Sequence, residues 1–359
     1  MHASVGNTLH LSSSPKDCCS KYSYKEEKHR HTPLCEISTQ HWLTMVMQKS
    51  KQQHKVEVVK EALKKVEDVH YGHVNGEIEV CSDAFKVDWG RVPSELDPGS
   101  VVPARSQRKR QQLSSFLNLF EVVLPSSSRG ATVCDVGSGS GMLGLLLAHM
   151  YPHLHVVCLE LSHNKLSSSQ QRAETCGVCN VEHVHASAAD LLGRDGTLAP
   201  DVLIGLHCCG LLTDFALSAA AELNAPFCIA PCCYGQTADS PPLIDPHAKA
   251  GARSCSSCVG ALPRSKLIAE RLSASEFERI ARAADVSQQQ HEQCNARRRS
   301  CDWVGNYTQR ARALVNADRV ALVHELSDGR YHISVEQLQP EECSGMREVL
   351  IGKRIESHV

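Results

Sequence analysis

The residues whose types and spacing can do chemistry lie near the middle of the chain. Asp135 ends a short apolar run, and Gly137, Gly139 and Gly141 follow it. Glycines at this spacing let the backbone turn sharply off a strand and approach a ligand closely, at the amino terminus of a helix. Glu160 ends the next apolar run, where a carboxylate can accept hydrogen bonds from both hydroxyls of a ribose. The pattern predicts a site for a nucleoside cofactor.

Two other interpretations of the glycines stay open. Gly139, Gly141 and Gly144 also fit the spacing of a dinucleotide fingerprint, which would indicate a nicotinamide-dependent oxidoreductase. Asp135 speaks against that class, because a dinucleotide site usually keeps the strand before its glycines apolar. The remaining interpretation is a tight turn that holds no ligand.

A later apolar run is also followed by polar side chains, namely His207, Cys208, Cys209, Thr213 and Asp214. We predict catalytic roles for His207 and Asp214, because ligands of an open α/β sheet bind beyond the carboxyl ends of its strands. His207 is the natural general base at such a place. The alternative for His207 is a hydrogen-bonded side chain that only stiffens the loop.

The next strand end combines cysteines with an aromatic side chain. Tyr234 either covers a ligand or closes the core. A thiolate metal site is one interpretation of Cys208, Cys209, Cys232 and Cys233. Adjacent cysteines on one strand point to opposite faces of the sheet, however, and this argues against the site. We therefore predict no metal at these strand ends.

Two Cys-x-x-Cys pairs offer another zinc site, Cys176 with Cys179 and Cys255 with Cys258. Gly177 lies inside the first pair and is typical of a helix end, which favours a structural interpretation. The chain has 18 cysteines, many of them inside apolar runs, where they serve as small core residues. We expect reduced thiols in a cytoplasmic protein.

Alternating strands and helices must position these residues. After Arg129 we predict seven strands, over residues 131–136, 154–160, 181–186, 202–207, 227–230, 331–338 and 348–352. Helices are predicted between them, over residues 141–150, 163–176, 212–223, 273–286 and 310–326. Such alternation predicts a Rossmann-like α/β fold, with a mostly parallel sheet and helices on both of its faces. The last two strands are expected to form an antiparallel hairpin at one edge.

The chain is expected to divide after residue 88. Residues 1–88 are interpreted as a variable, partly disordered extension with one amphipathic helix over 51–69 and an alternating stretch at 77–80. Residues 91–104 are rich in proline and are expected to form a linker or an edge-wrapping loop, and 105–124 a helix. Residues 89–359 are then the main domain.

Composition limits the partners. The 359 residues include 42% hydrophobic but only 4% aromatic side chains, and the formal net charge is -2. A protein coated in positive charge for nucleic acid is thereby excluded, although a local basic patch is not. Arg297, Arg298 and Arg299 with Trp303 and Tyr307 are the candidate patch for RNA, and 105–110 is a second. The alternative for both is a charge run that is merely solvated. No run of 18 apolar residues exists, so we expect no membrane span.

A family resemblance sharpens the interpretation. Residues 135–141 with Glu160 look like the cofactor site of class I S-adenosylmethionine-dependent methyltransferases. Residues 206–214 and 231–235 resemble the methyltransferase-like domain of the glutathione S-transferase C-terminal domain-containing protein family, and more distantly tRNA 2′-O-methyltransferases. Further stretches that match are 108–113, 263–266, 275–277 and 340–344.

The resemblance implies that S-adenosyl-L-methionine is the cofactor. It places Asp135, Gly137, Gly139 and Gly141 at the methionine end and Glu160 on the ribose. Ser187 falls where such enzymes often place Asp or Asn against the adenine. RNA is the leading acceptor by distant resemblance. The alternative is a non-catalytic protein that keeps the fold for cofactor binding or as a scaffold.

Overall fold

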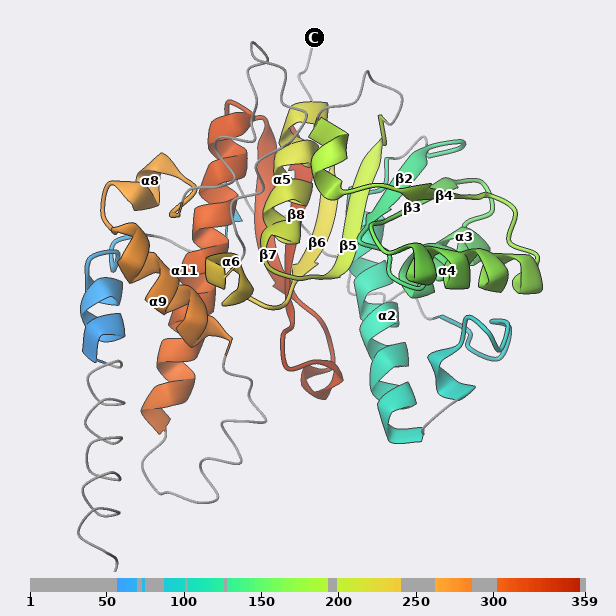
Figure 1. The fold of residues 1–359 in the computed structure, drawn as a ribbon, viewed down its shortest axis with the longest axis horizontal. Helices are drawn as coiled ribbons and strands as arrows, with labels where there is room; N and C mark the ends of the chain where they lie inside the picture. Colours follow the sequence, from blue (N-terminus) through green and yellow to red (C-terminus); the bar gives the residue numbers. More distant parts are fainter. Residues whose placement is uncertain are drawn as a thin grey trace, which may run out of the picture. The chain divides into compact units, whose positions relative to one another are not determined.

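The structure is a computed structural model, and it describes residues 57–69, 73–74, 87–100, 103–125, 128–192, 199–239, 262–285 and 302–355. The chain divides into two units, Met1–Gln52 and Gln53–Val359. All described residues lie in the second unit (Figure 1).

One mixed sheet organises this unit. Its strands follow the order β1-β7-β8-β6-β5-β2-β3-β4. The parallel strands are β2 (Thr132–Val136), β3 (His155–Glu160), β4 (Val181–His185), β5 (Val202–Cys208) and β6 (Phe227–Pro231). The antiparallel strands are β7 (Tyr331–Gln337) and β8 (Glu348–Arg354). The predicted mostly parallel sheet with an antiparallel hairpin is confirmed.

The hairpin of β7 and β8 does not by itself form the edge of the sheet. β8 lies between β6 and β7, and the two-residue strand β1 (His73–Val74) pairs with the outer side of β7, His73 opposite Ser334. The edge expected for the hairpin therefore carries one further strand. Nothing in the apolar pattern indicated so short a pairing.

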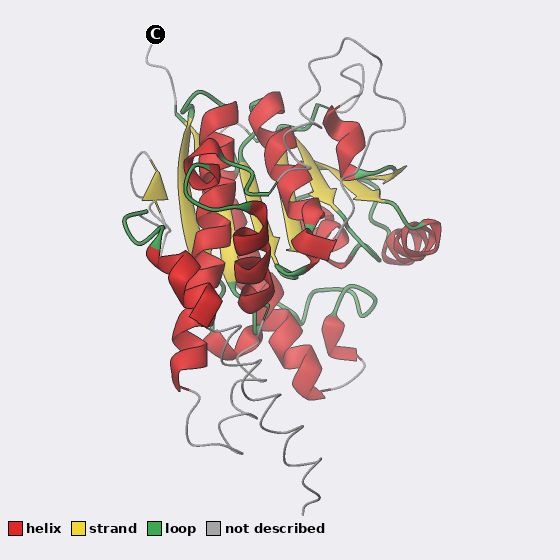
Figure 2. Cartoon of the chain, turned by 60° about the vertical axis from the view of Figure 1, so that its left-hand side comes forward, coloured by secondary structure: helices red, strands yellow, loops and turns green. Residues whose placement is uncertain are grey.

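Helices cover both faces of the sheet (Figure 2). The core on one face is built with α2 (Pro103–Val123), α3 (Met142–Met150) and part of α4 (His163–Cys176). The core on the other face is built with α5 (Leu211–Leu223) and α11 (Asp302–Leu326). Neighbouring strand residues such as Val133 and Cys134 enter opposite cores, as the period of two requires.

Short helices complete the described unit: η1 (Pro98–Ser100), η2 (Ala188–Leu192), α6 (Gln236–Asp239), α8 (Lys266–Ala269), α9 (Ala274–Ala284) and η3 (Glu341–Cys343). The helix predicted over 273–286 is α9, and a capping box of Ser273 and Glu276 begins it. Gly177 ends α4 with a φ of 66°, as its place in the sequence predicted. Among the described helices, none is long and apolar enough to cross a membrane.

The boundary predicted after residue 88 differs from the division of the chain into units, which falls after Gln52. The amphipathic helix is described over residues 57–64, and its apolar side chains Val59, Leu63 and Val66 pack into a cluster with Phe277 of α9 and Leu314 of α11. Burial of this face makes the helix part of the second unit. The alternating stretch at 77–80 lies outside the described residues.

The proline-rich stretch after residue 90 is a packed loop and no free linker. Val92 and Leu96 are buried in the core that contains α2. Asp97 accepts a hydrogen bond from the Nε atom of Arg110 at 2.7 Å and so ties the loop to α2. The alternative of an edge-wrapping loop comes closer to what is observed.

Candidate active site

The glycine loop connects β2 to α3. The backbone N–H groups of Gly137 and Ser138 donate to the carbonyl oxygen of Leu159, at 2.8 and 3.0 Å, and so hold the loop against the end of β3. Gly139 has a φ of 59°, and a Cβ atom added there would meet nothing within 4 Å. Gly141, by contrast, is packed so tightly that its Cβ would lie 1.9 Å from the Ser169 Oγ atom. The loop is therefore fixed at Gly141 and open at Gly139.

Glu160 lies beside the open part of this loop. Its two carboxylate oxygens accept from the backbone N–H groups of Gly139 and Ser162, each at 2.9 Å. An ionised carboxylate has about four acceptor positions, so two of them remain for a ligand. The two backbone hydrogen bonds orient Glu160. The residue is 8% exposed, so a ligand can reach it from the rim of the sheet at the carboxyl ends of the parallel strands. This arrangement can hold the two hydroxyls of a ribose.

Asp135 lies deeper, at the end of β2. It is 2% exposed, and its Oδ2 atom accepts from the N–H of Gly144 in the first turn of α3 at 3.0 Å. Burial raises the pKa of Asp135 to about 7, against the opposing effects of the Gly144 bond and the Lys109 ammonium. The carboxylate therefore orients the helix that follows the loop and is ready to be ionised by a cationic ligand group.

Ser187 does not offer the adenine contact in the form that the resemblance implied. Its backbone N–H donates to Asp190 Oδ2 at 2.7 Å, and its Oγ accepts from the N–H of Ala189 at 3.1 Å. The serine thus caps η2. The exposed carboxylate of Asp190 is an acceptor that the sequence analysis overlooked, since it stands three residues past the expected position.

Leu161 is an exposed apolar side chain next to Glu160. Three large hydrophobic side chains are exposed among the described residues, and Leu161 leads them at 68%, ahead of Leu267 at 40% and Ile355 at 39%. It follows Glu160 directly, and its carbonyl oxygen lies 2.8 Å from His185 Nε2 at the end of β4. An exposed leucine beside a ribose-type acceptor can pack on the face of a base.

His207 meets two side chains of α2. Its Nε2 atom lies 3.1 Å from Lys109 Nζ and 3.0 Å from Gln112 Oε1. Partial burial of the ring and the lysine charge lower its pKa to about 4, although part of the residue faces solvent. Burial likewise lowers the pKa of Lys109 to about 8. The backbone of His207 has a φ of 68°, which few residues other than glycine adopt.

Lys109 and Gln112 were not singled out as functional from the sequence. Both fall within the stretch 108–113 that carried part of the family resemblance, and this was the available signal. Lys109 Nζ also donates to Gln112 Oε1 at 2.7 Å, so the three side chains form one cluster. Because the ammonium can only donate and the Gln112 Oε1 atom can only accept, His207 Nε2 accepts from Lys109 in one tautomer and donates to Gln112 in the other.

Asp214 lies elsewhere, and the catalytic role predicted for it is not supported by its surroundings. Its side chain is 0% exposed and forms ion pairs with Arg264 at 2.8 Å and Arg319 at 2.9 Å. A carboxylate enclosed by two guanidinium groups cannot touch an acceptor. Asp214 is a structural residue, and its sequence position after β5 was misleading because α5 turns it into the core.

Tyr234 is also a core residue, and the ligand-covering interpretation is wrong. It is 0% exposed, its hydroxyl accepts from Asn316 Nδ2 at 3.1 Å, and the Arg319 guanidinium lies 5.4 Å from its ring centroid. These contacts fix the segment after β6 against α11.

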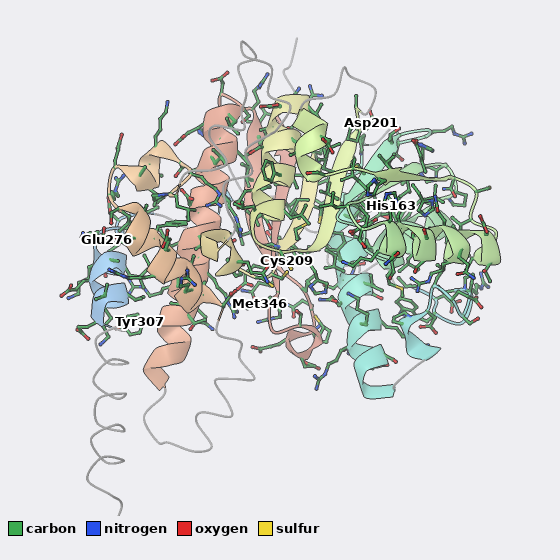
Figure 3. All side chains as sticks on the ribbon, in the orientation of Figure 1. His163, Asp201, Cys209, Glu276, Tyr307 and Met346 are labelled. Carbon is green, nitrogen blue, oxygen red and sulfur yellow. The ribbon has the colours of Figure 1, made fainter. Side chains whose placement is uncertain are left out.

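The strand-end cysteines separate into two kinds. Cys208 is buried with its Sγ directed at the carbonyl oxygen of Val136, at 3.6 Å. The sulfur atoms of Cys209, Cys232 and Cys233 instead lie within 4.8 Å of one another (Figure 3 labels Cys209). The sequence argument against convergence is wrong here, because β6 ends at Pro231 and the alternation of a strand no longer applies.

The remaining predicted clusters are only partly described. Cys179 is exposed and Cys176 half-buried, while Cys255 and Cys258 lie outside the described residues. The triple arginine Arg297–Arg299 and the side chain of Trp303 lie outside them too. Of the second basic stretch, Arg110 is bound to Asp97, and Arg108 is exposed.

The strand order, the glycine loop after β2 and the carboxylate after β3 define a methyltransferase-like protein. Residues 108–240 match the family model described as a methyltransferase domain. That match spans the site from Lys109 past the cysteine cluster. Over these residues the chain is similar to a methyltransferase domain.

Curated relatives agree with this class. The chain is 28% identical over 274 residues to the glutathione S-transferase C-terminal domain-containing protein of Xenopus laevis, covering 76% of this chain and 39% of that protein. It is 25% identical over 273 residues to the Drosophila melanogaster homolog, covering 76% of this chain and 41% of that protein. The chain thus spans about two fifths of the length of these relatives. The resemblance seen in the sequence is confirmed.

Solved structures give weaker likenesses. StiE O-MT matches with a TM-score of 0.32 and 15% identity, covering 84% of this chain and 92% of that one. PKMT2 from Rickettsia typhi in complex with AdoHcy matches with a TM-score of 0.28 and 19% identity, covering 36% and 27%. Scores this low carry no inference about the activity of this chain.

Proposed function

We propose that this protein binds S-adenosyl-L-methionine and transfers its methyl group to an acceptor, with RNA as the leading acceptor class. The observation that carries the proposal is the pairing of Glu160 with the N–H of Gly139, at 2.9 Å, beside open space at that glycine. A loop held open next to an oriented carboxylate suits a nucleoside, whereas a mere tight turn needs neither feature.

Each part of the cofactor has a matching group. The free acceptor positions of Glu160 suit the ribose hydroxyls. The exposed side chain of Leu161 suits one face of the adenine, and the carboxylate of Asp190 suits its amino group. Asp135 and the loop Gly137–Gly141 suit the methionine end, whose ammonium would neutralise the buried carboxylate.

The main contribution of the protein to methyl transfer is to position the acceptor against the methyl group. When bound, the cofactor supplies an electrophilic methyl group on a sulfonium, and the acceptor must approach it in line. His207, Lys109 and Gln112 lie at the end of β5, which neighbours the loop-bearing strand β2 in the sheet. They are placed to orient the acceptor, and His207 to assist removal of its proton.

The cysteines support a cytoplasmic location. Ten described cysteines are free thiols, and those in the core are small packing residues that the fold uses as such. Such thiols persist in the reducing cytoplasm, where we place the protein.

The second candidate is a protein that binds the cofactor without turnover. It is favoured by the φ of 68° at His207 and by the engagement of its Nε2 atom with Lys109, which together fix the ring in place. A fixed histidine suits a structural role as well as a catalytic one.

The test is methyl transfer to total cellular RNA from a radiolabelled cofactor, measured for the wild type and for His207→Ala. We expect transfer by the wild type, a loss of about 10²–10⁴-fold in rate for His207→Ala, and unchanged cofactor affinity. Tight cofactor binding without transfer to RNA, protein or small molecules would favour the non-catalytic candidate. A His207→Ala variant that loses cofactor affinity would assign the residue to the fold.

A further inference from the structure

Three cysteines converge where the loops after β5 and β6 meet. The Sγ atoms of Cys209, Cys232 and Cys233 all lie within 4.8 Å of one another, and those of Cys209 and Cys233 are 3.4 Å apart. A zinc ion with Zn–S bonds of about 2.3 Å in a tetrahedral arrangement keeps its sulfurs roughly 3.8 Å apart. The separations in the cluster need only small side-chain rotations to match.

The backbone around the cluster is held in place by bonds that do not involve the thiols. The N–H of Gly210 donates to the carbonyl oxygen of Cys233 at 3.3 Å, which joins the two loops directly. The Thr213 hydroxyl donates to the carbonyl oxygen of Cys208 at 2.6 Å and fixes the first of them. The three sulfurs are thus gathered before any ligand arrives, which lowers the entropy that binding must overcome.

These thiols differ from the other cysteines of the described chain. Cys134, Cys158, Cys208 and Cys228 are enclosed by apolar neighbours, and burial raises the pKa of each thiol. The Sγ atoms of Cys209, Cys232 and Cys233 instead adjoin one another, all within 4.8 Å. Cys209 and Cys233 are half-buried, so an ion can reach them from solvent.

The charge of the cluster also suits a cation. Asp285, the C-cap residue of α9, lies near enough to add a negative charge at Cys209 and Cys233. A metal ion would offset that charge, and its binding would release the thiol protons to solvent.

We propose that Cys209, Cys232 and Cys233 bind a zinc ion through three thiolates. Borderline-soft zinc prefers sulfur, and three protein ligands leave its fourth position to water or to an atom of a substrate. Cys209 lies two residues past His207, so the fourth position would face the rim where the acceptor is expected. This inference replaces the expectation of no metal at the strand ends and does not depend on methyl transfer.

The experiment is elemental analysis of the full chain purified under reducing conditions without chelator. We expect stoichiometric zinc in the wild type and its loss in Cys209→Ser and in Cys233→Ser. Cys179→Ser is the matched control, because that thiol is exposed and outside the cluster, and it should keep the metal. The double variant Cys255→Ser/Cys258→Ser should keep it as well.

A second readout guards against variants that fail to fold. Cobalt(II) titrated into the metal-free wild type should give the near-ultraviolet thiolate charge-transfer bands and the visible bands of a tetrahedral site. Zinc lost only from the Cys255/Cys258 variant would overturn the proposal, as would a wild type with free thiols and no cobalt bands. A stable Cys209–Cys233 disulfide found by mass spectrometry under these conditions would overturn it too. S-adenosylmethionine binding, measured in parallel, reports separately on the proposed function.

Discussion

The protein holds Asp135 and Glu160 in one way and Asp214 in the opposite way. Asp135 and Glu160 accept hydrogen bonds from the backbone N–H groups of Gly144, Gly139 and Ser162. Asp214 is instead enclosed by the guanidinium groups of Arg264 and Arg319.

The difference separates a binding site from a structural network. Backbone donors occupy only part of a carboxylate, so acceptor positions remain for a ligand. The two guanidinium groups occupy and neutralise Asp214, and they link α5 to α11 and to the segment before α8. Acidic residues after strands are thus ambiguous until their partners are known.

The largest effect is expected for Asp214→Ala. It leaves Arg264 and Arg319, whose side chains are 2% and 1% exposed, without their counter-charge. Removing one partner of a buried ion pair costs about 3–5 kcal/mol of stability. Urea denaturation followed by circular dichroism measures the loss. Asp68→Ala, which removes an ion pair with Arg271 where the aspartate is 71% exposed, should change stability by less than about 0.5 kcal/mol. Equal stability of the two variants would contradict the structural role of Asp214.

Glu160→Ala should act on binding more than on folding. Losing an ionised acceptor costs roughly 1.5–3 kcal/mol, which is about 10- to 100-fold in cofactor affinity. The freed N–H groups of Gly139 and Ser162 are near the rim and can bond to water. Calorimetric titration with S-adenosylmethionine measures the effect, and Glu182→Ala, an exposed acidic change on β4, serves as the control. Unchanged cofactor affinity in Glu160→Ala would contradict the assignment of Glu160 to the ribose hydroxyls.

Cofactor affinity should fall as the pH drops below about 7. Burial raises the pKa of Asp135 to about 7, so below that pH the free protein carries a proton that an incoming ammonium must displace. The loss approaches tenfold per pH unit well below the pKa, and it is absent above it. Titrations of the wild type and of Asp135→Asn across this range isolate the contribution of Asp135 to the pH dependence of cofactor affinity. The titration of the ligand itself is common to both proteins. Parallel pH profiles would show that Asp135 stays ionised or does not face the ligand.

The smallest effect is expected for Leu161→Ala. Removal of the exposed side chain takes away the apolar surface offered to the adenine, at about 0.8 kcal/mol for each methylene group that the ligand buries. We expect cofactor binding to weaken by roughly five- to tenfold, with the fold unaffected. Leu267→Ala on α8 is the matched control, being the next most exposed leucine. Equal affinities in the two variants would show that no ligand covers Leu161.

The sequence predicted the sheet well because each strand is a short apolar run bounded by turn residues. The strand β3 and the helix α4 begin and end within a residue of their predicted limits. Glu160 also lies beside the loop Gly137–Gly141, as expected of residues that follow neighbouring strands. The roles that could not be predicted are those of residues whose contacts come from residues far away in the sequence. Lys109 reaches His207 from a helix near the start of the domain, and Arg319 encloses Asp214 from near its end.

The convergence of the three cysteines could not be predicted from the sequence either, although these residues are closer together in the chain. Strand alternation argued that Cys232 and Cys233 diverge, but the strand stops at Pro231 and leaves both thiols free to turn toward Cys209. The exact end of a strand is set by sheet packing, which apolar pattern alone does not report.

Calorimetric titration of the wild-type chain with S-adenosylmethionine, beside NAD, tests the central claim most directly. The oriented carboxylate of Glu160, the open backbone at Gly139 and the charge of Asp135 predict saturable binding of S-adenosylmethionine or its demethylated product, and none of NAD. Micromolar affinity for NAD with no response to S-adenosylmethionine would contradict the assignment of this site.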